Sequence, residues 1–220
     1  MKKDVSDYIV ELVTRVPALE PCFKDIERAY ALMEECYEKG GKLLIAGNGG
    51  SCADAEHMVG ELMKSFKLPR KTDGAFVDAL VAADPVRGKD IAARLCRGLP
   101  AVALNSHPGL LTATINDVER GGEIIFAQQL YSLGSAGDLF FGISTSGNSE
   151  DVLCAAAVAR ATGMKLVSLT GETGGELAKK ADAAIRVPAR ETYLVQELCL
   201  PVYHTLCLML EDRFFCEEGR

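Results

Sequence analysis

His57 and Glu61 stand four residues apart in a segment with helix-forming composition, so both side chains lie on one face of the expected helix. A histidine beside a carboxylate can bind a metal ion, or can serve as an acid and base in proton transfer. The same spacing also occurs in ordinary surface pairs that only stabilise a helix. This pair is therefore a candidate site that needs further polar groups beside it.

Further polar groups occur near the C-terminus, in residues 191–211. This segment is mostly apolar, which predicts a long buried helix that is interrupted or kinked near Pro201. Gln196 and His204 lie two turns apart on roughly the same side of it. A buried histidine is more often a hydrogen-bonded core residue than a ligand, but buried polar groups of either kind need partners.

A hydroxyl-rich loop, residues 144–149, lies between an apolar run and an alanine-rich helical segment. It contains four hydroxyl side chains and one glycine: Ser144, Thr145, Ser146, Ser149 and Gly147. The free N–H groups and positive dipole at a helix start favour an anion, and glycine lets the backbone approach it. The alternative is that Ser149 or Asn148 only caps the helix. The number of hydroxyl groups favours a phosphate site.

Residues 47–51 repeat this plan after a strand predicted at 42–46 and before a helix predicted at 53–64. The pattern is similar to a dinucleotide-binding fingerprint, but its sixth position is Cys52 rather than glycine or alanine. A second ligand-facing loop fits better. Residues 170–175 form a third such turn.

The elements that position these loops are five predicted strands, at 42–46, 99–104, 139–143, 165–169 and 183–187. Strands that alternate with helices predict an α/β fold, with a central parallel sheet flanked by helices, in which ligands bind at the carboxyl ends of the strands. Residues 4–39 predict two helices that pack on a sheet edge or on another subunit. Residues 65–99, with Lys64, Lys67, Arg70 and Lys71 at their start, predict a solvated excursion or helical insertion without chemistry.

Composition excludes several classes of protein. The 220 residues carry a net charge of −7, with a pI near 5.1 and no basic cluster, which argues against direct nucleic-acid binding. The eight cysteines form no C-x-x-C pair, so we expect reduced thiols. We expect no membrane span and no signal peptide, and hence a cytoplasmic protein.

These motifs together resemble the sugar isomerase (SIS) domain family. The residues that carry the resemblance are Gly47–Ser51, His57 with Glu61, Asn116–Asp117, Gly142–Ser149, and Gln196 with His204. The serine loop is typical of the whole superfamily. The His/Glu and Gln/His pairs are similar to those of the phosphoheptose isomerases, which convert sedoheptulose 7-phosphate to D-glycero-D-manno-heptose 7-phosphate.

The resemblance implies a flavodoxin-like three-layer sandwich, aldose–ketose isomerisation through an enediol, and a homotetramer with active sites between subunits. It implies one zinc ion per chain, bound by His57, Glu61, Gln196 and His204, with Glu61 and His204 as the acid/base pair. It also implies a sugar-phosphate site, whose residues are Asn48, Gly49, Gly50, Ser51, Asn116, Asp117, Ser144, Thr145, Ser146, Ser149 and Gln196.

Two non-catalytic functions stay open beside the enzyme. One is an SIS protein that binds the replication initiator protein as a regulator, and the other is a sugar-phosphate sensor, which needs the serine loop but not the His/Glu pair. The presence of both Glu61 and His204 favours the isomerase. Cys199, Tyr193 and the long 65–99 segment depart from the family's pattern, which leaves the exact sugar phosphate open.

Overall fold

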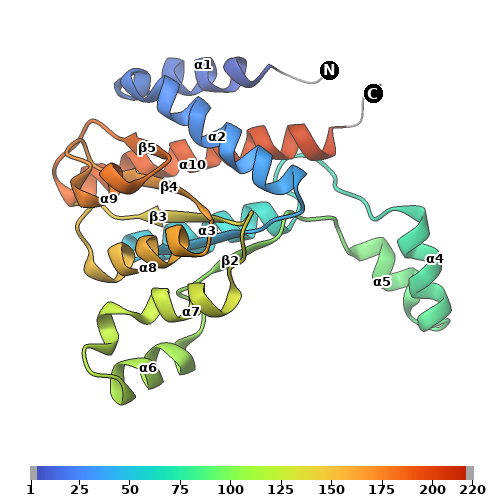
Figure 1. Cartoon of the computed structure of the whole chain (residues 1–220). Coiled ribbons are helices and arrows are strands. Elements are labelled where there is room, and N and C mark those ends of the chain that lie inside the picture. The colour runs from blue at the N-terminus through green and yellow to red at the C-terminus, as the bar shows by residue number, and fades with distance from the viewer. Residues whose placement is uncertain (1–3, 217–220) are drawn as a thin grey trace.

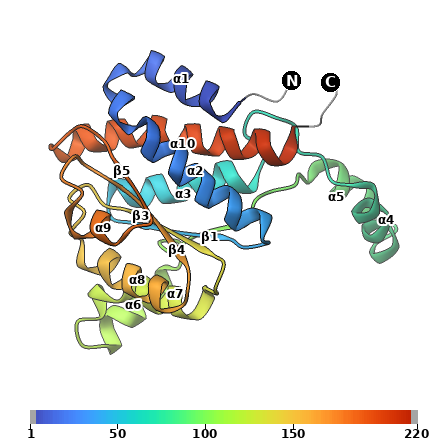
Figure 2. The ribbon, with the colours of Figure 1, turned by 45° about the horizontal axis from the view of Figure 1, so that its top comes forward.

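A computed structural model describes residues 4–216 and contains a five-stranded parallel sheet between two layers of helices (Figures 1 and 2). In spatial order the strands are β2 (Ala101–Ala103), β1 (Leu43–Gly47), β3 (Leu139–Ile143), β4 (Lys165–Thr170) and β5 (Ala183–Arg186). All neighbouring strands pair in parallel. The predicted fold class is confirmed, and each strand lies within one or two residues of its predicted bounds.

Alternating side chains on the strands build two separate cores. On β1, Leu43 and Ile45 face one core, while Leu44 and Ala46 face the other. The helices of the first core are α1 (Val5–Arg15), α2 (Phe23–Glu38), α3 (Gly50–Met63) and α10 (Thr192–Phe215). Those of the second core are α7 (Ile125–Leu133), α8 (Glu150–Ala161) and α9 (Gly175–Lys180). Because both faces are covered, the strands read as continuous apolar runs.

The strand order reverses between β1 and β3, and this reversal fixes where a ligand can bind. The chain leaves β1 toward β2 on one side and later leaves β3 toward β4 on the other. In open parallel sheets, ligands bind in the crevice outside the carboxyl ends of the two strands at such a point. Gly47 pairs with Ile143 at that edge, so the loops that follow β1 and β3 start side by side.

The N-terminal helices pack on their own chain. A 3-10 turn, η1 (Pro17–Cys22), joins α1 to α2 and contains both prolines of this region. Helix α1 packs on α10, and α2 packs on α10 and on the edge strand β5. Within this chain they belong to the helix layer on one face of the sheet, and the expected packing on another subunit stays a prediction.

Residues 72–95, called the arm below, project away from the rest of the molecule (Figures 1 and 2). The arm contains α4 (Gly74–Ala83) and α5 (Gly88–Arg94), which pack on each other. No side chain of α4 is buried, and Phe76 on this helix is 44% exposed. At the base of the arm, Lys71 pairs with Cys96 in an antiparallel bridge.

Helix α10 runs without a break through Pro201, so of the predicted interruption or kink, the interruption is wrong. Proline removes one backbone hydrogen bond, but α10 packs against α1, α2 and α3, and this burial holds the helix together. Helix α10 also bears on the expectation that the chain has no membrane span. Its 24 residues, with a mean hydropathy of 1.3 over the best window, are long enough to cross a membrane, but half of that window is buried inside the protein. Helix α10 therefore packs as a core helix of this domain.

Candidate active site

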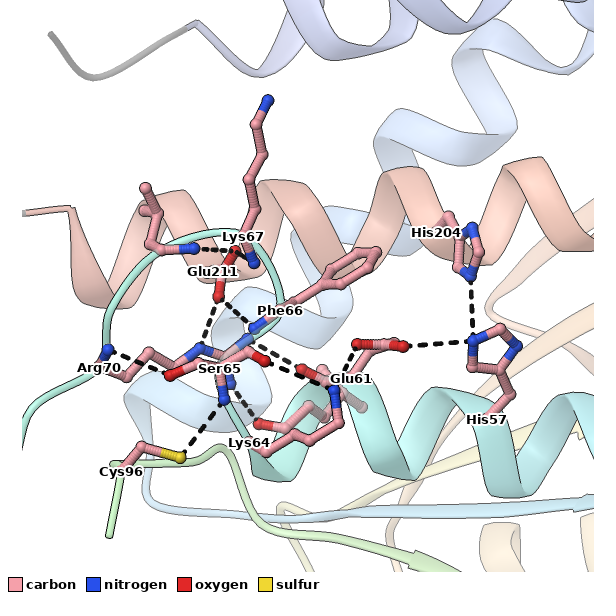
Figure 3. Close-up of polar contacts among 12 residues, drawn as sticks. His57, Glu61, Lys64, Ser65, Phe66, Lys67, Arg70, Cys96, His204 and Glu211 are labelled. Carbon is pink, nitrogen blue, oxygen red and sulfur yellow. Dashed lines mark hydrogen bonds and ion pairs between the residues drawn. The ribbon is translucent and has the colours of Figure 1, made fainter. Parts of the chain in front are cut away.

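Helices α3 and α10 bring His57, Glu61 and His204 together, and these three residues are called the histidine cluster below (Figure 3). The Nε2 atom of His57 lies 3.2 Å from Oε1 of Glu61 and 3.3 Å from Nε2 of His204. All three ligating atoms lie within 4.8 Å of one another. The His57–Glu61 pair and His204, which are 143 or more residues apart in sequence, thus lie close enough to act on one ligand.

Close packing at the start of α3 makes this meeting possible. A Cβ atom on Gly50 would lie 2.5 Å from Nε2 of Gln196, so the absence of a side chain at Gly50 leaves room for the Gln196 amide in its observed position. From there the two helices run side by side in the same direction, with Gly50 beside Gln196 and His57 beside His204. The glycine loop after β1 is therefore also one of the places where α3 and α10 contact each other.

The donor set and spacing of the histidine cluster fit a divalent metal ion. Zinc takes nitrogen and oxygen ligands at about 2.0–2.1 Å, which places neighbouring ligand atoms of a tetrahedron about 3.3 Å apart. The two contacts of His57, at 3.2 and 3.3 Å, match such edges. Three protein ligands leave a fourth position open, which is typical of catalytic rather than structural zinc sites.

The surroundings of the cluster suit proton transfer. The Glu61 side chain is only 11% exposed, and Lys64 Nζ lies 3.3 Å from its second oxygen. Burial, and then the neighbouring His57, lowers the pKa of His204 below its ordinary value, so its imidazole is neutral near pH 7. The ring of Phe66 lies over His204, with 5.5 Å between ring centroids, and covers one side of the cluster.

A tyrosine and an aspartate stand behind His57. The Tyr203 hydroxyl lies 3.0 Å from Nδ1 of His57 and donates to Oδ1 of Asp54 at 3.1 Å. Burial, and then the Asp54 charge, raises the pKa of Tyr203 well above its ordinary value, so it stays a phenol. Burial also raises the pKa of Asp54. These two residues were not predicted, although Asp54 lies three positions before His57 and Tyr203 directly precedes His204.

A buried ion pair, Arg70 with Glu211, lies farther along the same two helices (Figure 3). Glu211 accepts hydrogen bonds from Nε of Arg70 at 2.8 Å and from the backbone N–H groups of three consecutive residues, 66–68. The Arg70 guanidinium also donates to the carbonyls of Glu61 and Leu62, which are free at the end of α3. The expectation of a solvated, positively charged start to the 65–99 segment is therefore wrong for Arg70.

The serine loop, residues 144–149, joins the end of β3 to the start of α8. The hydroxyls of Ser144 and Ser149 lie 2.9 Å apart, and Ser149 makes no side-chain capping bond to α8. Gly147 has a φ of 69°, and a Cβ there would lie 2.0 Å from the Gly174 carbonyl oxygen, so glycine is required. Asn148 accepts from the N–H of Glu176 and ties the loop to α9. The simple capping alternative thus does not describe these side chains.

The glycine loop, residues 47–51, is joined to the serine-loop side of the site. The amide of Asn48 donates to both carboxylate oxygens of Asp151 in α8, at 3.0 and 2.9 Å. Gly49 has a φ of 57°, which favours glycine, and Ser51 is buried in the first turn of α3. The third predicted loop meets the serine loop, since the Gly171 N–H donates to the Thr145 carbonyl.

Two predicted groups lie apart from the histidine cluster in this chain. Gln196 precedes His204 by eight residues of helix, which span about 12 Å, and its amide lies against Gly50. Asn116 and Asp117 end α6 (Pro108–Asp117), a helix that the sequence pattern did not predict. Both are exposed, and the Asn116 amide donates to the Asp117 carboxylate at 2.7 Å. Their predicted ligand roles stay predictions.

Comparisons with known proteins agree with this arrangement. An SIS domain model matches residues 98–210, and a second SIS domain model matches residues 7–84. The sequence is 34% identical over 218 residues to a phosphoheptose isomerase of Aneurinibacillus thermoaerophilus, covering 96% of each protein. The fold is similar to phosphoheptose isomerase from Neisseria gonorrhoeae, with a TM-score of 0.71 and 31% identity over 94% of this chain and 96% of that one. The enzyme from Francisella tularensis gives a TM-score of 0.70 at 31% identity, over 93% and 91%.

Proposed function

Because this chain belongs to the SIS domain family, and within it to the phosphoheptose isomerases, we propose that it interconverts sedoheptulose 7-phosphate and D-glycero-D-manno-heptose 7-phosphate. The observation that carries the proposal is the histidine cluster, in which a nearly buried carboxylate lies beside two imidazoles. An anion-binding regulator or sensor has no need of such a cluster, so the non-catalytic alternatives are not favoured.

The reaction moves a proton between two adjacent carbons and another between their oxygens, through an enediol. Glu61 is the base for the carbon-bound proton, since its carboxylate lies in a site that Phe66 and α10 partly cover from water. His204 serves the oxygens, because a neutral imidazole near pH 7 can both accept and give a proton.

The same three residues would hold a metal ion, which we propose to be zinc, one per chain. His57, Glu61 and His204 supply two nitrogens and one oxygen with suitable spacing. When bound, zinc supplies Lewis-acid polarisation of a sugar oxygen. The predicted fourth ligand, Gln196, suits the sugar-phosphate site better in this chain, because its amide lies beside the glycine loop.

We propose that the sugar phosphate is held by the serine loop and its helix, with the glycine loop and Gln196 along the rest of the ligand. The free N–H groups at the start of α8 and the paired hydroxyls of Ser144 and Ser149 support this. Replacing Ser144 and Ser146 together by alanine should weaken sugar-phosphate binding about tenfold or more, since each hydrogen bond to a charged group contributes about 1.5–3 kcal/mol. Calorimetric titration would measure it, and unchanged affinity in a folded variant would contradict this site.

We also propose a cytoplasmic homotetramer with sites between subunits. The support within the chain is the arm, whose helices expose Phe76 and other apolar side chains that a neighbouring subunit would cover. Light scattering on the purified full-length chain should give four times 23.6 kDa, and a monomeric mass would contradict the proposal.

The activity itself is tested by incubating purified protein with sedoheptulose 7-phosphate and following aldose formation by chromatography. Unphosphorylated sedoheptulose is the control, and we expect it to react far more slowly because it lacks the group that the serine loop binds. A panel of other ketose phosphates defines the substrate range. A protein that turns over none of them is not the proposed isomerase.

A further inference from the structure

We propose that Asp54 and Tyr203 are positioning residues that hold the proton of His57 on Nδ1, so that its Nε2 atom presents a free lone pair to the active site. The inference concerns the metal-free protein and goes beyond the proposed function, although its consequence for zinc rests on that function. It is carried by one hydrogen-bonded chain, Asp54–Tyr203–His57, and by one buried atom without a partner.

The hydrogen-bonded series Asp54–Tyr203–His57 has fewer N–H and O–H protons than it has nitrogen and oxygen atoms that could carry or accept one. A neutral imidazole has one N–H, the tyrosine has one O–H, and the carboxylates of Asp54 and Glu61 only accept. If His57 carries its proton on Nδ1, it donates to the Tyr203 oxygen, and the Tyr203 hydroxyl donates to Asp54. If the proton is on Nε2, it faces Glu61 and His204, and Nδ1 keeps a hydrogen bond only if Tyr203 donates to it, which takes the hydroxyl proton away from Asp54.

The state of Asp54 decides between these two arrangements. Its Oδ2 atom is buried and accepts no hydrogen bond from the described residues, so Oδ1 with Tyr203 is the hydrogen-bonded side of the carboxylate. Turning Tyr203 toward His57 would leave this half-buried carboxylate, whose Oδ2 is already buried without a partner, with no donor among the described residues, which is costly. Glu61, in contrast, keeps Lys64 as a partner whether or not His57 donates to it. The proton on Nδ1 is therefore favoured.

Packing fixes the geometry that this hydrogen bonding needs. Tyr203 is 1% exposed, and its ring meets the ring of His57 edge-on, with centroids 5.6 Å apart and an interplanar angle of 76°. It also meets the ring of His204 edge-on, at 5.1 Å and 84°. One aromatic ring thus orients both imidazoles. Ligating histidines commonly use the second ring nitrogen to donate to such a partner, which sets the tautomer.

The tautomer can be measured directly by nitrogen NMR of the imidazole rings in metal-free protein at about pH 8, where an ordinary histidine is neutral. The chain has three histidines, which makes assignment practicable. We expect His57 to show a protonated Nδ1 and an unprotonated Nε2. In Asp54→Asn the new amide can donate to the Tyr203 oxygen, which turns the hydroxyl toward His57 and moves the proton to Nε2. In Tyr203→Phe the partner is gone, and Glu61 should draw the proton to Nε2.

The matched control is Tyr131→Phe, which removes a hydroxyl from a tyrosine that is 73% exposed on α7 and should leave the His57 signals unchanged. A wild-type His57 protonated on Nε2 would overturn the proposal. So would variants of Asp54 and Tyr203 that fold and both retain the wild-type tautomer. Neither result depends on zinc or on isomerase activity.

Zinc affinity, measured by competition with a chromophoric chelator, tests the consequence for the metal. We expect Asp54→Asn and Tyr203→Phe to weaken zinc binding about 10–100-fold, as loss of such supporting hydrogen bonds usually does. The Tyr131→Phe control should bind as wild type does. Unchanged affinity in both variants overturns the positioning role. Failure of the wild-type protein to bind zinc overturns the proposed metal site alone, since the NMR result still decides the tautomer.

Discussion

The Arg70–Glu211 pair and the histidine cluster lie next to each other along α10, seven residues or about 10 Å apart (Figure 3), and their polar atoms differ in how fully they are used. Glu211 accepts four hydrogen bonds, and the guanidinium of Arg70 donates to it and to two carbonyls. In the histidine cluster, ring nitrogens face one another and a carboxylate, with no donor assured between them.

Exposure follows the same division. The side chains of Arg70 and Glu211 are 0% and 1% exposed, whereas His57 is 43% exposed beside a nearly buried Glu61. Buried charges that are fully paired hold a structure together, while polar groups that face each other at an opening have capacity left for a ligand. By this criterion the Arg70–Glu211 pair stabilises the fold, whereas the histidine cluster is available for a ligand or for proton transfer.

The largest effect should come from Glu61→Gln in the histidine cluster. Glutamine keeps the size and one oxygen but cannot act as a base, so the isomerisation rate should fall about 10²–10⁴-fold. Stability should change little, because the side-chain partners of Glu61, His57 and Lys64, are both exposed, and the hydrogen bond from Arg70 to the Glu61 backbone carbonyl is kept. Turnover of sedoheptulose 7-phosphate and thermal unfolding measure the two quantities. A rate within a few-fold of wild type would show that Glu61 is not the base.

The opposite outcome is expected for Glu211→Gln. Its amide group would face donors, leaving the Arg70 charge buried and unpaired, which typically costs about 3–5 kcal/mol. Denaturant unfolding should show this loss. Activity per folded molecule should remain within a few-fold at low temperature, because the carboxylate lies outside the histidine cluster.

Two results would break the comparison at this pair. Wild-type stability of Glu211→Gln would mean that the pair contributes nothing net, in spite of its hydrogen bonds. A folded Glu211→Gln protein without activity would mean that the pair also shapes the site, through the carbonyl contact between Arg70 and Glu61.

The smallest change in stability is expected for Arg94→Gln on the arm. This variant removes an ion pair that is exposed to water, which is the opposite case to the buried Arg70–Glu211 pair. Arg94 pairs with Asp90 one turn earlier on α5, and both side chains are more than two-thirds exposed. Such helical pairs contribute at most about 0.5 kcal/mol. Unfolding curves that superimpose on wild type are expected, and a loss above 2 kcal/mol would show that burial is not what distinguishes the pairs.

Much of the fold could be predicted because its signals are local. Apolar runs such as 139–143 and the small-residue loops after them mark strands that end at a ligand edge, and those strands were found close to their observed bounds. The His57–Glu61 spacing was also readable, since four residues of helix fix a shared face. Packing between distant parts of the chain could not be predicted in this way. The continuity of α10 through Pro201 depends on neighbouring helices that the local sequence does not reveal.

The support of the site was missed for a similar reason. Arg70 stands in a stretch with several lysines, and only its contact with Glu211, 141 residues away, shows that it is buried. Tyr203 stands among apolar residues and carries no signal of its partner Asp54. A hydrogen-bonded chain between two helices is a property of their packing, so it becomes visible only when both helices are in place.

The two ends of the arm meet where it leaves the body. Arg97 donates its N–H to the Arg70 carbonyl at 2.7 Å, and Lys71 bridges Cys96 beside it. The chain therefore leaves and re-enters the body of the domain at nearly the same point, so residues 72–95 form an insertion whose two ends lie side by side. We expect a chain in which these residues are removed, or exchanged for another pair of helices, to keep α3 and β2 in place, because residues 70–71 and 96–97 already lie side by side. This junction is therefore a place where the chain can gain or lose a surface for a neighbouring subunit without a change in the connection between α3 and β2.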